Sequence, residues 1–366
     1  MPYITQSSYT SRGLFKSGHV QTIYPTLFRT VNHSRAQSKS SPKHQNQCSY
    51  QHQYRRERLE LLDGDFLDLD WTTHADCNND RNDTHNTRNT RNTHNGKHKH
   101  NGRLAILCHG LESSTDATYM RCMAKACHLS GWDSVGYNFR GCSGEPNRLP
   151  HAYHCGLTED LDKVVQHAIK TDRYRSISLI GFSLGGNLVL KYLGERGQDV
   201  APQITNAAAV SVPCDLADSS IELERWDNWV YKTRFLRLLV SKSKLKKALI
   251  SQQLGQWPSD EIRSIKDFDE YFTAPLNNFR GADHYYETTS SIRFLSQIQR
   301  PTLLLNAKND PLLGENCYPY SIAENNAALY LETPLYGGHV GFIQDAPDDL
   351  YWHEQRILEF LNSTQA

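Results

Sequence analysis

The stretch of residues 176–197 constrains the fold more than any other part of the sequence. It begins with the short run SISLIG, whose β-branched apolar residues favour a strand, and after Phe182 and Ser183 it ends with LGGNLVLKYLGERG. In this second half, apolar residues recur at helical spacing until two glycines end the pattern: Leu184, Leu188 and Tyr192, then Gly194 and Gly197. The order predicts a strand, a tight turn and a helix.

The turn of this unit carries the pentad Gly181-Phe182-Ser183-Leu184-Gly185, a G-x-S-x-G pattern. Its small residues let the backbone turn sharply enough to lift a serine hydroxyl above a sheet. The pentad alone is weak evidence, because a chain of this length contains one by chance about one time in ten. The strand before it and the amphipathic helix after it are what the chemistry needs, so Ser183 is the predicted nucleophile.

Composition narrows the class of protein without naming a partner. The 366 residues fit one large α/β domain, which we prefer to two smaller ones, and 40 basic residues equal 40 acidic ones, so no nucleic-acid partner is expected. Nine cysteines show no C-x-x-C spacing, which indicates buried thiols in a reducing compartment. Residues 1–20 lack an apolar segment of signal-peptide type, and no run of about 18 apolar residues occurs. We expect a cytoplasmic protein without membrane insertion; its oligomeric state stays open.

The first third of the sequence has two segments without a core-forming pattern. Residues 1–50 are expected to form an arm packed on the body, and residues 73–102, rich in Asn, Thr, His and Arg, a polar and disordered loop. Histidines of this loop could bind a divalent metal, but no carboxylate or cysteine cluster sets a geometry, so we favour a solvated loop: His85, His94, His98 and His100. Between these segments, residues 56–71 predict a β-hairpin with a two-residue turn at Asp63-Gly64.

Expected strands alternate with expected helices along the rest of the chain. The strands are placed at 103–108, 134–139, 176–181, 206–212, 301–306 and 329–332, and the helices at 119–129, 156–170, 184–196 and 350–361. This alternation predicts an α/β fold, with a mainly parallel central sheet and helices on both faces.

Residues 213–299 interrupt the alternation with a long stretch that is helix-rich and aromatic. The stretch is too long for a simple crossover between strands, so it predicts a helical cap insertion over the active site. Four lysines form a local basic patch, which we interpret as a solvated helix face, with attachment to a membrane surface as the alternative: Lys242, Lys244, Lys246 and Lys247.

A serine nucleophile needs an imidazole to take its proton and a carboxylate to orient that imidazole. Asp310 follows the strand at 301–306, and His339 follows the strand at 329–332 within a Gly-Gly-His turn. The chain order serine, acid, histidine is that of α/β hydrolases. Four other acids are rivals for the role of Asp310: Asp215, Asp267, Asp269 and Asp283.

An oxyanion hole is expected from two backbone N–H groups. One belongs to Leu184, the residue after the nucleophile, and the other to Leu111, in the loop His109-Gly110-Leu111 that follows the strand at 103–108.

Several segments together resemble one known family: ERLELLDGDFLDLDW, HGLESS, GFSLGGN, KDFDEYFTAPLNNFRGADHYY, PTLLLNAKNDPLL and YGGHVGF. They are similar to the YheT-like branch of α/β hydrolases, also called the EMB8 or AB-hydrolase-4 family, from Gly18 onward. The resemblance implies the α/β-hydrolase fold and a serine esterase acting on carboxylic esters, with the triad carried onto Ser183, Asp310 and His339. We expect no cofactor and no metal. The polar segment after the hairpin is longer than the family usually has there.

Other activities share this triad. A serine at the turn excludes the dehalogenases and epoxide hydrolases, which need aspartate there, and the dienelactone-hydrolase type, which needs cysteine. A small-molecule ester is the expected substrate, of short to medium acyl chain. Thioesterase, peptidase, lipase and acyltransferase remain alternatives because they differ in the acyl pocket and not in the motif. A non-catalytic binding protein is the alternative from another class, although such proteins typically lose a triad member.

Overall fold

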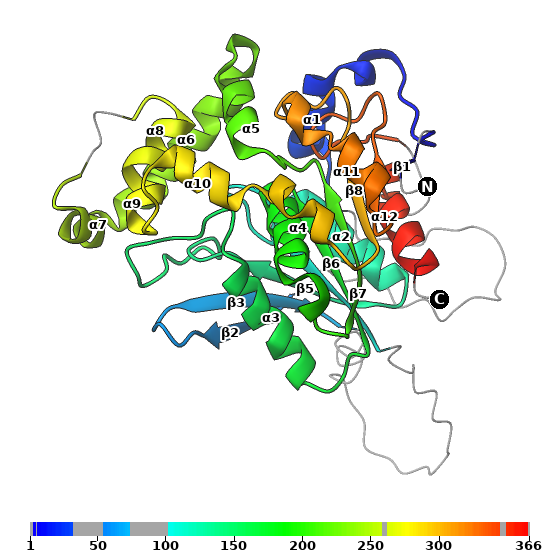
Figure 1. Cartoon of the computed structure of the whole chain (residues 1–366), viewed down its shortest axis with the longest axis horizontal. Coiled ribbons are helices and arrows are strands. Elements are labelled where there is room, and N and C mark those ends of the chain that lie inside the picture. Colours follow the sequence, from blue (N-terminus) through cyan, green and yellow to red (C-terminus); the bar gives the residue numbers. More distant parts are fainter. Residues whose placement is uncertain are drawn as a thin grey trace, which may run out of the picture.

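A nine-stranded sheet forms the centre of the described part of the chain (Figure 1). The structure is a computed structural model, and it describes residues 3–4, 6–31, 54–73, 102–257, 262–344 and 349–364. The strand order is β1-β9-β8-β7-β6-β4-β5-β3-β2, and only the pairs β2–β3 and β3–β5 are antiparallel. The strands are β1 Tyr3–Ile4, β2 Arg55–Glu60, β3 Phe66–Thr72, β4 Arg103–Cys108, β5 Asp133–Asn138, β6 Ser176–Phe182, β7 Ile204–Val210, β8 Thr302–Leu305 and β9 Leu329–Glu332.

Side chains of the central strands alternate between two cores. Leu104 and Ile106 of β4 face a core shared with α3 (Thr158–Lys170) and α4 (Leu184–Arg196). Ala105 and Leu107 face a core shared with α2 (Thr118–Leu129) and α12 (Trp352–Ser363). Helices therefore cover both faces of a mainly parallel sheet, which confirms the predicted fold class.

The β2–β3 hairpin differs from its prediction in the length of its turn. The two strands are separated by residues 61–65 and not by two residues, and the N–H of Leu61 donates to the carbonyl of Asp65 at 2.9 Å. Asp65 is fully buried, and its carboxylate accepts hydrogen bonds from Arg140, Asn147 and the N–H of Arg148. These contacts with distant residues set the turn, and a local sequence pattern does not contain them.

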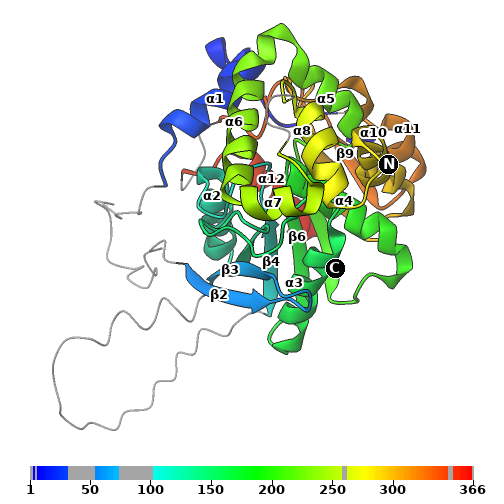
Figure 2. The same ribbon diagram turned by 90° about the vertical axis from the view of Figure 1, so that its left-hand side faces the viewer.

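Residues 213–299 contain helices that gather on one side of the sheet, coloured green to yellow in Figures 1 and 2. Part of this helical segment has a small core of its own, formed by Ile250, Phe268, Phe272 and Leu276. Its helices are α5 Leu216–Glu224, α6 Trp229–Leu245, α7 Lys247–Leu254, α8 Ile265–Phe268, α9 Ala274–Leu276 and α10 Ala282–Thr289, with a π-helical turn at Asp269–Thr273 between α8 and α9. A further short helix, α11, covers Tyr320–Asn325.

The described part of the N-terminal arm forms helix α1 (Gly18–Phe28). Figure 2 shows α1 beside α6, and His19 of α1 stacks on Tyr231 of α6 with ring centroids 5.8 Å apart. Strand β1 and a 3-10 turn at Gly13–Lys16 also belong to the expected arm. Residues 32–50 of the arm and residues 74–101 of the His-rich segment, with His85, His94, His98 and His100, lie outside the described residues.

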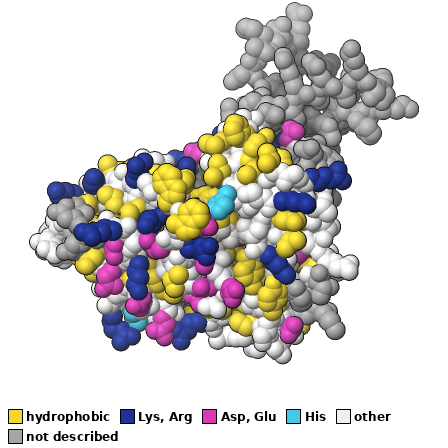
Figure 3. Space-filling view, turned by 90° about the horizontal axis from the view of Figure 1, so that it is seen from above, with side chains coloured by type: hydrophobic (Ala, Val, Ile, Leu, Met, Phe, Trp, Pro, Cys, Tyr) yellow, Lys and Arg dark blue, Asp and Glu magenta, His cyan; other side chains and the backbone are white. Residues whose placement is uncertain are grey.

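The described surface carries mixed charges. Seen from above, basic and acidic side chains are interspersed with apolar ones (Figure 3). The seven cysteines within the described ranges are all buried and free: Cys108, Cys122, Cys127, Cys142, Cys155, Cys214 and Cys317. Within those ranges, no helix is both long enough and apolar enough to cross a bilayer.

Candidate active site

Ser183 stands on a sharp turn between β6 and α4. Its backbone has φ 54° and ψ −121°, a conformation that residues other than glycine rarely adopt. The turn closes only because its neighbours are glycines: a Cβ on Gly181 would lie 2.3 Å from the Gly185 carbonyl oxygen. A Cβ on Gly185 would lie 2.3 Å from the carbonyl oxygen of Cys108 on β4. The pentad thus encodes a close approach of two backbones that lifts Ser183 out of the sheet.

The structure brings Ser183, His339 and Asp310 into one line. Nε2 of His339 lies 2.9 Å from Oγ of Ser183. On the other side of the ring, Nδ1 lies 2.8 Å from Oδ2 and 3.1 Å from Oδ1 of Asp310. The Asp310 side chain is fully buried, and its Oδ1 also accepts the N–H of Leu312 at 2.9 Å. In this position the carboxylate can accept a proton from Nδ1, and Nε2 can then accept one from the serine.

The rival acids are engaged elsewhere. Asp215 caps α5 by accepting the N–H of Asp218, and Asp267 forms the capping box of α8. Asp283 pairs with Lys266 at the surface, and Asp269 accepts the hydroxyl of Tyr286.

The turn that carries His339 packs against helix α1. The N–H of His339 donates to Oγ1 of Thr22 at 2.9 Å, and the N–H of Gly338 donates to Oδ1 of Asn309 at 3.0 Å. A Cβ on Gly338 would lie 2.5 Å from the carbonyl oxygen of Gly18, and one on Gly18 would lie 1.9 Å from the carbonyl oxygen of Asn309. Helix α1 therefore packs closely on both the acid loop and the histidine loop. The sequence analysis did not predict that this segment contacts the candidate site. The one indication in the sequence was Gly18, the first residue of α1.

The loop after β4 lies beside the serine. A Cβ on Gly110 would be 3.3 Å from Cβ of Ser183, and Leu111 lines the same pocket as Ser183. Within the described part of the chain, no acceptor is found for the N–H of Leu111 or for that of Leu184. Both groups are available to an oxygen of a bound substrate, as an oxyanion hole requires.

A buried histidine fixes the shape of this loop. Burial lowers the pKa of His109 to about 3, so its ring is neutral. Nδ1 of His109 donates to the carbonyl of Gly110 at 2.8 Å, and Nε2 accepts the N–H of Phe139 at 3.2 Å. The histidine of the His-Gly pair is thus a structural residue.

Glu112 ties the same loop to the helical segment. It has a positive φ of 48°, and its N–H donates to the hydroxyl of Tyr153 at 2.8 Å. That hydroxyl donates to Oε1 of Glu112 at 2.7 Å, and the same oxygen accepts Nζ of Lys242, on α6, at 2.9 Å. Neither Glu112 nor Tyr153 was singled out from the sequence, because their meeting depends on the fold.

The interpretation of the lysine patch as a solvated face is wrong for two of its members. The Lys242 side chain is only 19% exposed, and burial, which would lower its pKa, is outweighed by Cys142 and Glu112, which raise it. Lys246 is 6% exposed and donates to Oδ1 of Asn147 at 2.7 Å and to the His151 carbonyl at 3.1 Å. Burial lowers the pKa of Lys246 to about 8. Lys244 and Lys247 are exposed, as expected.

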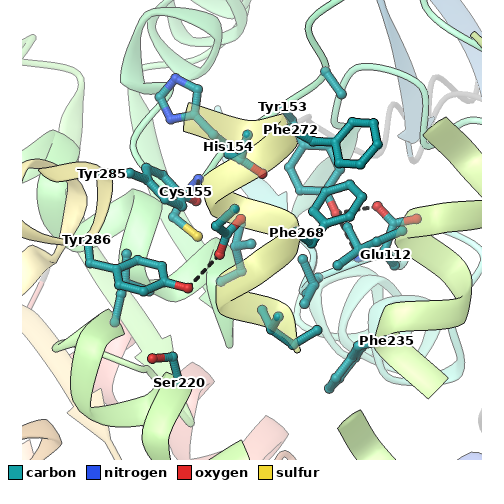
Figure 4. A pocket seen from close by; sticks show the side chains of 18 of the residues that line it. Glu112, Tyr153, His154, Cys155, Ser220, Phe235, Phe268, Phe272, Tyr285 and Tyr286 are labelled. Carbon is teal, nitrogen blue, oxygen red and sulfur yellow. Dashed lines mark hydrogen bonds between the residues drawn. The ribbon is translucent and has the colours of Figure 1, made fainter. Parts of the chain in front are cut away.

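A large pocket opens above Ser183 and His339. It encloses about 1240 Å³ of space including its open mouth, and most of its walls come from the helical segment. The walls are mainly apolar and aromatic (Figure 4), among them Leu216, Leu239, Phe235, Phe268, Phe272 and Tyr285. An apolar pocket with a few polar groups next to a nucleophile suits an acyl substrate. Among the described residues, no group of three or more His, Cys, Asp or Glu side chains is arranged to hold a metal ion.

Comparison with known proteins shows the family of the chain. The sequence model of a family described as the alpha/beta hydrolase fold matches residues 105–346. The YheT protein of Escherichia coli (strain K12) is 32% identical over 354 residues, which cover 95% of this chain and 91% of YheT. The embryogenesis-associated protein EMB8 of Picea glauca is 30% identical, covering 94% of this chain and 69% of EMB8. Phospholipase ABHD3 of Mus musculus is 30% identical, covering 80% of this chain and 67% of the phospholipase.

A solved structure shows the same fold. The esterase PF2001 of Pyrococcus furiosus superposes with a TM-score of 0.53 at 17% sequence identity, covering 86% of this chain and 91% of the esterase.

Proposed function

We propose, from the premise that the chain belongs to the α/β hydrolase fold family, that it is a serine esterase that cleaves carboxylic esters of short to medium acyl chain. One observation carries the proposal: His339 lies 2.9 Å from Oγ of Ser183 through Nε2 and 2.8 Å from Asp310 through Nδ1, at the base of an apolar pocket. This arrangement lowers the barrier for proton transfer from the serine as it attacks a carbonyl.

The reaction follows from the positions of these groups. Oγ of Ser183 attacks the ester carbonyl while Nε2 of His339 takes the hydroxyl proton. The negative charge that forms on the carbonyl oxygen meets the N–H groups of Leu111 and Leu184. Collapse breaks the bond to the alcohol, which leaves with the proton from His339. In the second half of the reaction, Nε2 of His339 takes a proton from water as the water attacks the acyl-serine. The proton then passes to Oγ of Ser183, which releases the acid and regenerates the serine.

Asp310 acts on the imidazole and not on the substrate. It accepts the Nδ1 proton, which holds the ring in the tautomer whose Nε2 is a base, and it stabilises the imidazolium that forms. No cofactor takes part in these steps.

The helical segment provides the acyl and alcohol site and acts as the cap of the enzyme. The apolar side chains of α5, α6 and α8 in the pocket wall support an acyl chain as the bound group. A matched relative is named a phospholipase, a name given to enzymes that hydrolyse ester bonds of phospholipids, which supports ester hydrolysis here.

Ser183→Ala tests the proposal. We expect it to abolish labelling by a fluorophosphonate probe and to lower kcat for 4-nitrophenyl butyrate by about 10⁴-fold to 10⁶-fold, with an unchanged circular dichroism spectrum. The matched control is Ser321→Ala, an exposed serine on α11, which should label and turn over as the unmodified protein does. Ester turnover that persists in Ser183→Ala at more than a hundredth of the original rate would refute the assignment. In a panel of acyl lengths, a rate maximum at 14 carbons or more would refute the preference for short and medium chains.

A further inference from the structure

The pocket wall opposite the sheet contains a buried carboxylate, Asp269. Asp269 is only 9% exposed, and it lines the same pocket as Ser183. The hydroxyl of Tyr286, on α10, donates to Oδ2 of Asp269 at 2.7 Å, the contact drawn as a dashed line from Tyr286 in Figure 4. Asp269 begins the π-helical turn 269–273, a local distortion that is frequent at functional sites.

Asp269 differs from the other charged groups of the pocket because no cation accompanies it. Lys242 and Glu112 neutralise each other at 2.9 Å. Lys246 donates to Asn147, whose amide in turn donates to the carboxylate of Asp65, so a carboxylate belongs to its network. Among the described residues, no ion pair involves Asp269 and its hydrogen-bond partners are neutral. A buried carboxylate without a cation is costly, and ordinary packing gives no reason to keep one.

The surroundings of Asp269 are neutral near pH 7. Burial raises the pKa of Asp269 to about 6, which still leaves it ionised at neutral pH. Burial also raises the pKa of its neighbours Cys155, Tyr285 and Tyr286, and it lowers that of His154 to about 3. The negative charge on this side of the pocket is therefore that of Asp269.

Aromatic rings surround the same part of the pocket. Phe268, Phe272, Tyr285 and Tyr286 all line it, and Figure 4 shows Tyr285 and Tyr286 beside Cys155 on one side and Phe268 and Phe272 on the other. Ring faces attract cations, and they do so more strongly where water is excluded. A carboxylate within an aromatic wall is the combination that recognises an organic ammonium group.

We propose that Asp269 and the aromatic side chains around it bind a positively charged ammonium group of the substrate, so that the preferred esters carry such a group. The inference rests on the proposed function, because it assigns the substrate class of the pocket above Ser183.

Two ligands of the same shape test the charge alone. Butyrylcholine carries a quaternary ammonium, and 3,3-dimethylbutyl butyrate has carbon in place of that nitrogen. Binding is measured by calorimetry in Ser183→Ala, which keeps the pocket and prevents turnover. We expect the ammonium ester to bind at least about tenfold more tightly than its neutral counterpart. The same ratio should fall severalfold when Asp269→Asn is added, because only the attraction of the aromatic rings for the ammonium group then remains.

Controls separate recognition from structural support. Asp283→Asn makes the same change at a side chain that is 80% exposed and should leave the tenfold ratio intact. Tyr286→Phe removes a hydroxyl donor that lowers the pKa of Asp269 and keeps the carboxylate and the ring, so the ammonium preference should persist when binding is measured at pH 8. If Asp269 is kept for binding, Asp269→Asn removes an uncompensated charge and should raise the melting temperature at pH 8. Equal binding of the two esters by the Ser183→Ala protein would overturn the proposal. A binding ratio that is unchanged in Asp269→Asn would also overturn it. So would a lower melting temperature in Asp269→Asn that is matched by Tyr286→Phe, because this would indicate a structural role.

The two proposals can fail separately. The ratio of binding constants requires no reaction, so a high ratio without any fluorophosphonate labelling would refute the esterase and leave the ammonium site. Labelling and turnover of the neutral ester with equal binding of both ligands would refute the ammonium site and leave the esterase.

Discussion

The strand-end loops that carry Ser183 and His339 pack closely against neighbouring backbone, whereas the helical segment of residues 213–299 reaches the loop after β4 through side chains. In the loops, an added Cβ at Gly181, Gly185 or Gly338 would lie 2.3–2.5 Å from a backbone oxygen. The helical segment packs on a core of its own and reaches the loop after β4 through the pair Lys242–Glu112.

This difference indicates which residues tolerate substitution and which do not. A close backbone contact leaves no room for a side chain, so Gly185 constrains the serine turn against β4 and Gly338 constrains the histidine loop against α1. Side-chain contacts can be exchanged one at a time, so the pocket walls can vary without moving the loops. We therefore expect substitutions in the loops to act on bond making or on folding. Substitutions in the pocket walls of the helical segment should act on binding, except at Lys242, which contacts the loop after β4.

The largest effect is expected at Asp310. Asp310→Asn keeps the shape of the side chain but favours the wrong tautomer of His339, so kcat should fall by about 10⁴-fold with little change in KM. Asp283→Asn, in the helical segment, should leave ester hydrolysis within about twofold. Steady-state kinetics on 4-nitrophenyl butyrate measure both. Should Asp310→Asn retain a tenth of the activity while Asp215→Asn or Asp267→Asn is inactive, the acid is another residue.

A smaller effect is expected from glycine substitutions in the two regions. Gly185→Ala places a Cβ 2.3 Å from the Cys108 carbonyl oxygen and should lower the free energy of unfolding by about 3 kcal/mol. Gly255→Ala follows α7, where φ is +79° and no atom lies within 4 Å, so only the backbone strain of about 1 kcal/mol applies. Urea denaturation followed by fluorescence measures the two values. Equal losses would show that the loops are no more constrained than the helical segment.

The smallest effect concerns the contact between the two regions. Lys242→Met should lower kcat about tenfold, because Glu112 loses the partner that helps to hold the loop of Leu111. Lys242→Arg should restore most of the loss, and Lys244→Met, an exposed lysine of the same helix, should have no effect. The measurement is kcat against KM on a neutral ester. An increase in KM alone would assign Lys242 to binding and remove its link to the oxyanion loop.

The elements that could be predicted are those whose sequence pattern lies within the element itself. The ends of β6, β9 and α2 are predicted to within one or two residues, because the apolar periodicity of each element is visible in a short continuous stretch of sequence. The candidate site was predicted from Ser183, Asp310 and His339 because each follows a strand whose end lies at the same edge of a parallel sheet. The structure brings these three side chains together; their catalytic role stays a prediction.

What could not be predicted depends on contacts between distant residues. Lys242 and Lys246 looked solvated because neighbouring lysines usually are, and their burial depends on Glu112 and Asn147, about 100 or more residues earlier. Asp269 looked like one acid among several, and only the pocket distinguishes it. The role of Thr22 was hidden for the same reason, since its partner His339 is 317 residues away.

Helix α1 gives this enzyme a particular order of assembly in time. A ribosome that adds about 5–20 residues per second makes α1 roughly 15–60 seconds before the loops of Asn309 and His339 exist. The helix that packs on both loops must therefore wait, or bind elsewhere, until nearly the whole chain has emerged. Most of the sheet can form during that wait, so the fold should precede the alignment of the histidine. Newly made molecules would pass through a stage that is folded but not yet competent.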